Sequence, residues 1–116
     1  MSEEKVTIRD IVKTIQQEVS HSEDLLPERA AELLVKLSAL LGNINQFIID
    51  REMTYNEVLR LAYESEEKAN RAKIKAESSQ AYREKLEARA TKEVCLEIIR
   101  SLKYYLKAKQ EEFLHS

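Results

Sequence analysis

One glycine and one proline occur in this chain of 116 residues, and their scarcity constrains its fold more than any other feature. Glycine supplies the unusual backbone conformations of tight turns, and proline interrupts the hydrogen bonding of helices and strands. A chain almost without either has few means of making the many short turns of a β-sheet protein. Charged residues make up 34% and aromatic residues only 6%, a composition typical of long, surface-exposed helices. We therefore predict an all-α fold.

Residues at alternating steps of four and three form a predicted seam from Ala30 to Ala90, and most of them are apolar. This heptad spacing places side chains on one side of a helix that packs against another helix. The rhythm slips near Thr91 and then continues to Tyr105, so we expect a register change or a turn there. The predicted seam comprises Ala30, Leu34, Leu37, Leu41, Ile44, Ile48, Arg51, Tyr55, Val58, Ala62, Ser65, Ala69, Ala72, Ala76, Ser79, Arg83, Leu86 and Ala90.

Capping signals mark the starts of two helices in the first half of the chain. Thr7 and Asp10 form a capping box before apolar residues at helical spacing, which predicts a short amphipathic helix over 8–20. Pro27 suits the first position of a second helix, because a proline there loses no helical hydrogen bond. We expect this second helix over 27–51.

The rest of the chain carries weaker signals. Thr54 and Glu57 form a second capping box, so we expect a helix to begin at residue 54. Residues 78–80 are a poorer turn signal, which leaves two alternatives open. The predicted fold therefore has three to four helices, with either one long coiled-coil-like helix over 54–111 or a helical hairpin of 54–77 and 80–111.

Length, cysteine content and the N-terminal sequence bear on where the protein works. The chain is long enough for a single helical domain, residues 1–116. Its one cysteine, Cys95, excludes an intramolecular disulfide and suits a reducing compartment. No uninterrupted apolar run approaches the ~20 residues of a membrane span, and the first residues lack the layout of a signal peptide. We expect a cytoplasmic protein that does not contact a membrane.

No residues have the spacing of a catalytic, metal or cofactor site. His21 and His115 lie in polar or terminal segments with no nearby partner that completes a metal motif. Cys95 lies on the apolar stripe of the last helix with no histidine near it in sequence, which favours a buried thiol over a nucleophile. One glycine cannot build a glycine-rich phosphate loop. We expect no enzyme activity, no metal and no cofactor.

Charge is unevenly distributed between two parts of the chain. Residues 1–67 contain seven Lys or Arg against fourteen Asp or Glu, whereas residues 68–109 contain twelve against five. Two interpretations stay open. The acidic part pairs with the basic part, within one chain or between chains, or the basic part contacts an anionic partner such as nucleic acid.

Basic residues also recur one position before the predicted seam and would form a basic stripe on a continuous helix. Such a stripe can follow a phosphate backbone, but charges beside a helix contact are more often simply solvated. Glu77, Glu84 and Glu87 lie nearby and weaken its field, so nucleic acid is not the favoured partner. The basic stripe comprises Lys68, Arg71, Lys75, Tyr82, Lys85, Arg89 and Lys92.

The predicted seam is made of small residues between residues 62 and 79. Small side chains remove little apolar surface from water, at ~25 cal/mol per Å², so this stretch needs another helix backbone close by. A homo-oligomer supplies one, and the tyrosine-rich end of the last helix offers a second contact. The candidate oligomer seam comprises Ala62, Ala69, Ala72, Ala76, Leu102 and Tyr105.

Two segments and the Ala-rich charged helix between them carry a resemblance. They are Ala62-Tyr63-Glu64 and Ile99-Arg100-Ser101-Leu102-Lys103-Tyr104-Tyr105-Leu106. This part of the chain resembles small helical accessory proteins of the early and replication regions of tailed phages. It is also similar in layout to phage recombination mediators, helical oligomers that help load a recombinase on single-stranded DNA. The resemblance covers about half of the chain and implies a phage or prophage origin, without assigning a role to any residue.

The sequence favours a non-enzymatic, self-associating helical adaptor that acts through contacts with a host or phage protein. One alternative is an accessory factor associated with single-stranded nucleic acid in phage replication or recombination. Another is a phage inhibitor of a host defence enzyme, because such inhibitors share this composition. Salt-dependent binding to an oligonucleotide would separate the nucleic-acid alternative from the other two.

Overall fold

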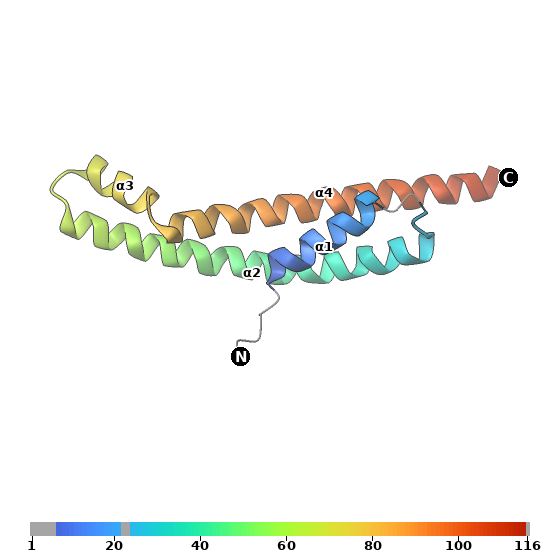
Figure 1. Ribbon diagram of the computed structural model, residues 1–116, viewed down its shortest axis with the longest axis horizontal. Helices are drawn as coiled ribbons and strands as arrows, with labels where there is room; N and C mark the ends of the chain where they lie inside the picture. Colours follow the sequence, from blue (N-terminus) through green and yellow to red (C-terminus); the bar gives the residue numbers. More distant parts are fainter. Residues whose placement is uncertain (1–6, 22–23, 116) are drawn as a thin grey trace. The chain divides into compact units, whose positions relative to one another are not determined.

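The computed structural model describes residues 7–21 and 24–115, and helices account for 92% of these residues. The elements are α1 (Ile8–His21), α2 (Pro27–Ser65), α3 (Ala69–Glu77) and α4 (Gln80–His115), as labelled in Figure 1. No strand occurs in the described ranges. The predicted all-α fold with long helices is therefore confirmed.

Two compact units share the two long helices. Unit 1 comprises Met1–Gly42 and Thr91–Ser116, and unit 2 comprises Asn43–Ala90. Helix α2 therefore contributes its first part to unit 1 and its second part to unit 2, and α4 does so in the opposite order.

The start of α1 in unit 1 is the predicted capping box. The backbone N–H of Asp10 donates to Thr7 Oγ1 at 3.1 Å, and the backbone N–H of Thr7 donates to Asp10 Oδ2 at 3.2 Å. These bonds satisfy two amides that have no partner inside the helix. Hydrogen bonding by the side chain and by the backbone N–H of Thr7 lowers the pKa of the Asp10 carboxyl.

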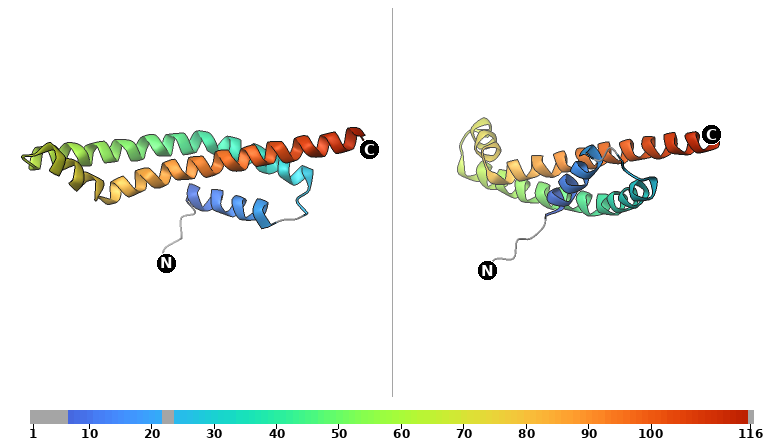
Figure 2. Two further views of the ribbon diagram at one scale, coloured as in Figure 1. Left: turned by 90° about the horizontal axis from the view of Figure 1, so that it is seen from above. Right: turned by 45° about the vertical axis from the view of Figure 1, so that its right-hand side comes forward.

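The core of unit 1 is built from α1, the first part of α2 and the last part of α4. Figure 2 shows α1 running beside these segments. Each of the three presents apolar side chains at helical spacing to the same interior. The buried residues of unit 1 are Val12, Ile15, Ala30, Leu33, Leu37, Thr91, Cys95, Ile98, Ile99 and Leu102.

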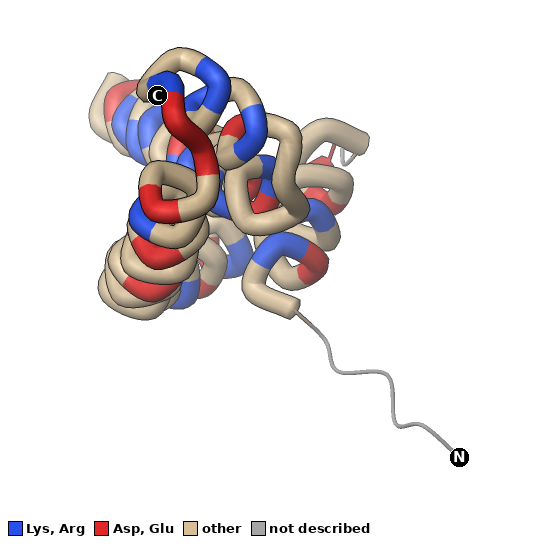
Figure 3. The backbone as a smooth tube through the Cα atoms, turned by 90° about the vertical axis from the view of Figure 1, so that its left-hand side faces the viewer, with Lys and Arg blue, Asp and Glu red and all other residues tan. Residues whose placement is uncertain are grey.

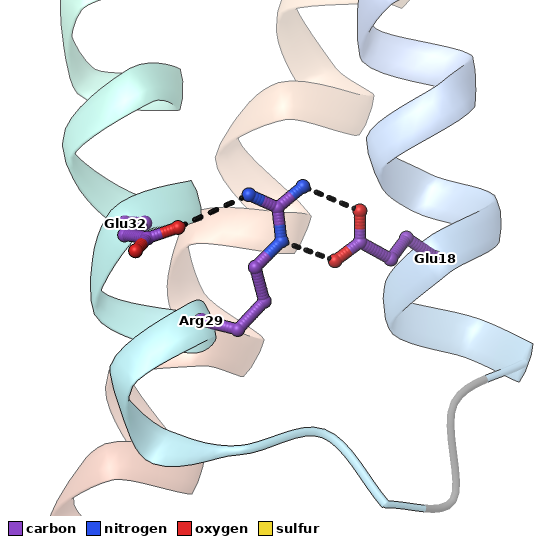
Figure 4. A network of polar contacts seen from close by, with 3 residues as sticks. All are labelled: Glu18, Arg29 and Glu32. Carbon is purple, nitrogen blue, oxygen red and sulfur yellow. Dashed lines mark hydrogen bonds and ion pairs between the residues drawn. The ribbon is translucent and has the colours of Figure 1, made fainter.

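A network around Arg29 joins α1 to α2 at the edge of this core (Figure 4). The Arg29 guanidinium donates through Nε and Nη2 to the two carboxylate oxygens of Glu18, at 2.6 and 2.7 Å. Its Nη1 donates to Glu32 of α2 at 3.2 Å. Two parallel bonds to one carboxylate fix the angle between the groups as well as their distance, so Arg29 sets how α1 meets α2.

The predicted helix boundary near Thr54 is wrong, because α2 continues from Pro27 to Ser65. Thr54 Oγ1 donates to the backbone oxygen of Asp50 at 3.0 Å, a bond made by threonines inside helices rather than at their starts. Met53 is 65% exposed and does not pack as the hydrophobic staple of a helix start.

The chain instead turns at residues 66–68 and at Ser78–Ser79. No sequence signal predicted the first turn, but the second is the signal considered weaker, and α4 begins at Gln80 as predicted. Ser79 Oγ accepts from the backbone N–H of Tyr82 at 3.2 Å, which caps α4. Residues 54–111 are therefore neither one helix nor the two predicted helices, because they contain the end of α2, the short α3 and most of α4.

The predicted change of register near Thr91 is also wrong, because α4 passes through Thr91 without a break. The positions Ala88, Thr91 and Cys95 keep the steps of three and four, and all are buried. The predicted seam positions Arg83, Leu86 and Ala90 are exposed instead. The pattern of buried positions changes register at the turn at Ser78–Ser79, because α4 begins there as a new helix.

Helix α2 is apolar enough over its length to pass, by length and composition alone, the test for a membrane-spanning helix. The core helix of a soluble protein passes the same test. It is the one helix of the described ranges to do so. Its apolar residues are spread along the helix and not gathered in one uninterrupted run.

Candidate functional site

The core of unit 2 is built around alanines that permit close packing of α2 and α3. Ala62, Ala72 and Ala76 are 4, 0 and 0% exposed, and they form one apolar cluster with Tyr55. A methyl group is small enough for helix backbones to approach closely, and Tyr55 is the one large side chain among the buried members of the cluster. The partly buried residues packed against this cluster are Val58, Leu59 and Tyr82.

The residues of the candidate oligomer seam are therefore mostly used inside the chain. Three of them form the unit 2 cluster, and Leu102 is 1% exposed in unit 1. The hydroxyl of Tyr105 donates to the backbone oxygen of Leu25, and only Ala69 is exposed. The second backbone required by the small residues belongs to the same chain.

The basic stripe is not continuous, because the turn at Ser78–Ser79 separates its α3 members from its α4 members. The α4 members of unit 2 contact α2. Tyr82 packs on the unit 2 core, and Lys85 Nζ lies 4.4 Å from the centre of the Tyr55 ring. Arg89 donates through Nε and Nη2 to Glu52 Oε1, at 3.1 and 2.5 Å.

Opposite charges on α2 and α4 pair within unit 2. Besides the Arg89–Glu52 contact, Arg51 Nη1 lies 3.1 Å from Glu84 Oε2. The hydrogen bond from Arg89 is the main reason that the pKa of the Glu52 carboxyl is lowered. Figure 3 shows blue segments of Lys and Arg interspersed with red segments of Asp and Glu. Of these two pairs, Glu52–Arg89 joins an acidic residue of the first part of the chain to a basic residue of the second part.

Of the remaining stripe residues, Lys68 precedes α3, two lie within α3, and one lies in unit 1. Lys75 lies 3.6 Å from Glu66, and Lys92 is half-buried in unit 1. Lys68 and Arg71 are exposed and form no ion pair with any residue of the described ranges. These two are the cations of the predicted stripe that stay open to an anionic partner.

A surface hollow of about 520 Å³ lies beside α3 in unit 2, and the sequence did not predict it. Lys75 Nζ donates to Ser65 Oγ at 3.3 Å, while that hydroxyl donates to the backbone oxygen of Ala62 at 3.2 Å. Lys75 Nζ also lies 3.6 Å from Glu66 Oε1. The hollow is lined by Val58, Leu61, Ala62, Glu64, Ser65 and Lys75.

Cys95 has the environment of a structural thiol. It is fully buried, and its Sγ lies 3.8 Å from the backbone oxygen of Leu37. Burial raises the pKa of the thiol and so disfavours the reactive thiolate. His21 is exposed at the end of α1, and no group of three or more His, Cys, Asp and Glu side chains that could hold a metal occurs in the described ranges.

Comparisons of the chain with protein-family models, with curated proteins and with solved structures found no match.

Proposed function

We propose that the protein is a non-enzymatic, self-associating helical adaptor that acts through protein–protein contacts. The main support is the pair Ile49 and Met53 on α2, which are 49 and 65% exposed. They lie one helical turn apart on the side opposite the buried Ile44 and Tyr55, so they add little to the core of unit 2. Large apolar side chains placed together in water suit a surface that another protein covers.

A capture experiment tests the adaptor role. The parent chain should retain a specific protein from host or phage-infected lysate, and Ile49→Lys with Met53→Lys should abolish retention. A matched variant, Asn43→Lys with Thr54→Lys, places two lysines on exposed positions of a different side of α2. Equal loss in both variants would attribute the effect to charge and contradict the assigned surface. A retained host defence enzyme would favour the inhibitor alternative.

Sedimentation equilibrium tests the self-association. The apparent mass of the parent should rise with concentration toward that of a dimer or tetramer. A parent that stays monomeric at high micromolar concentration would contradict this part of the proposal and leave the adaptor role to the capture experiment.

A phage or prophage origin is part of the proposal, and the resemblance of the segment from Ala62 to Leu106 supports it. The alternative function is association with single-stranded nucleic acid, supported by Lys68 and Arg71, which have no ion-pair partner in the described ranges. Under that alternative, charge reversal at these two residues weakens oligonucleotide binding and flattens its salt dependence, because fewer counterions are released. Unchanged binding would exclude them as the contact.

A further inference from the structure

The outward side of the last turns of α4 carries a row of exposed residues. Tyr104 is 78% exposed and Leu114 is 69% exposed, and the exposed Lys107 and Glu111 lie between them. Figures 1 and 2 show α4 extending past the first turn of α2, and the turns of α4 beyond that point have no other described helix beside them. We call Tyr104, Lys107, Glu111 and Leu114 the α4 outer face.

The spacing of the α4 outer face is that of a helix contact. Its members follow one another at steps of three, four and three, which are the steps between positions that face a partner helix. Leu102 is 1% exposed and precedes Tyr104 by two residues, which corresponds to about 200° around the helix. The α4 outer face therefore points away from the core of unit 1.

The centre of the α4 outer face is a surface hollow, and its two charged side chains form no ion pair with another described residue. Tyr104, Lys107, Ala108 and Glu111 line a surface hollow of about 170 Å³. The small Ala108 side chain leaves room for another helix to approach. Neither Lys107 nor Glu111 forms an ion pair within the described part of the chain.

We propose that the α4 outer face binds the same face of a second copy of this chain, with the two α4 helices antiparallel. In an antiparallel pair, residues at position a of the heptad face residues at position d of the partner helix. One register then places Tyr104 against Leu114 of the second copy and Lys107 against Glu111 of the second copy. The twofold axis repeats both contacts.

A second copy is favoured over other partners because the row is complementary to itself when reversed. Each apolar residue meets an apolar residue, and each charge meets the opposite charge, which a twofold interface requires. A nucleic acid would meet Glu111 as well as Lys107 and gains no net attraction from the row. The contact is smaller than the ~1,200–2,000 Å² buried in stable complexes, so we expect a dimer that dissociates on dilution.

The inference rests on the proposed self-association and identifies the surface that carries it. Sedimentation equilibrium of the full chain is the test, applied to Lys107→Glu and to Glu111→Lys. Each variant places like charges opposite one another twice, which we expect to raise the dissociation constant about tenfold. Lys73→Glu, an equal charge change at an exposed lysine of α3, is the control and should leave the dissociation constant unchanged.

Restored association is the decisive result. An equimolar mixture of the two variants again opposes unlike charges at both contacts, and so does the double variant. Both should associate within about threefold of the parent, because the facing pairs are equivalent. Helical circular dichroism should be the same throughout, since all changes are at exposed positions.

Two results would overturn the inference, and they differ. Equal dissociation constants for the parent and Lys107→Glu would mean that self-association uses another surface. So would a mixture of the two variants that does not regain the association of the parent. A parent that is monomeric at every concentration would contradict self-association itself, together with this interface.

Discussion

The rings of Tyr55 on α2 and Tyr82 on α4 lie with their centroids 5.3 Å apart and their planes inclined at 47°. This separation falls within the range of favourable aromatic pairs. Tyr55 is the one large residue among the buried members of this cluster, and Tyr82 packs against it, so the two rings supply apolar surface that the buried alanines cannot.

Truncation of Tyr55 should therefore destabilise the protein strongly. Tyr55 is 6% exposed, and we expect Tyr55→Ala to lower the free energy of unfolding by about 3 kcal/mol. Tyr63→Ala, at a residue that is 48% exposed, is the matched control and should cost less than about 1 kcal/mol. Urea denaturation measures both, and equal losses would contradict the assigned core.

Replacement of Gly42 should stabilise α2. A Cβ atom at Gly42 would meet no heavy atom within 4 Å, and the residue lies within the helix. Alanine restricts the unfolded chain more than glycine does, so Gly42→Ala should add roughly 0.5–1 kcal/mol to the free energy of unfolding. The urea midpoint should rise with an unchanged slope. A fall in the midpoint would indicate a neighbour close to this position.

The Glu52–Arg89 pair should contribute to the pH dependence of stability. The pKa of Glu52 in the folded state is lowered from its ordinary value of 4.5. The contribution of the pair to the free energy of unfolding is therefore complete above pH 4.5 and is lost as the pH falls below it. Glu52→Gln should reduce the free energy of unfolding at pH 7 and bring it closer to that of the parent in acid. Thermal unfolding from pH 7 to pH 2 checks this, and a constant difference would contradict the pairing.

The Cys95 thiol should react slowly in the folded protein. Burial limits access and raises its pKa, so few molecules present a thiolate at neutral pH. Modification by an aromatic disulfide should accelerate strongly when urea unfolds the chain. Fast reaction without urea would show that unit 1 opens readily around this residue.

Local signals in the sequence predicted well only where nothing competed with them. The Thr7–Asp10 capping box precedes the first helix and forms as expected. The same type of motif at Thr54 lies within a long apolar pattern, where bonding to the Asp50 carbonyl replaces capping. The motif alone contains no information about whether the preceding residues are already helical.

The small residues of the alanine-rich stretch do pack against a close helix, as predicted, but that helix belongs to the same chain and not to a second copy. The unmarked turn at residues 66–68 is the reason, since it folds Ala72 and Ala76 back onto Ala62. No glycine or proline indicates that turn. The α4 outer face lies beyond the predicted seam, which ends at Ala90.

The division of the chain into units has a consequence for the order of folding. Contacts of unit 2 such as Arg51–Glu84 and Arg89–Glu52 join residues 33 and 37 positions apart, whereas Cys95–Leu37 and Tyr105–Leu25 in unit 1 join residues 58 and 80 positions apart. The entropy lost on closing a loop grows with its length, so the contacts of the continuous segment are the less costly to form first.

Folding of unit 2 then shortens the effective loop between the part of unit 1 that precedes it and the part that follows it. We expect Tyr55→Ala to slow folding, and Val12→Ala to act mainly by accelerating unfolding, in stopped-flow kinetics. The reverse result would mean that the ends of the chain meet first. A hairpin placed in the middle of the sequence would thus act as the nucleus that brings its distant flanks together.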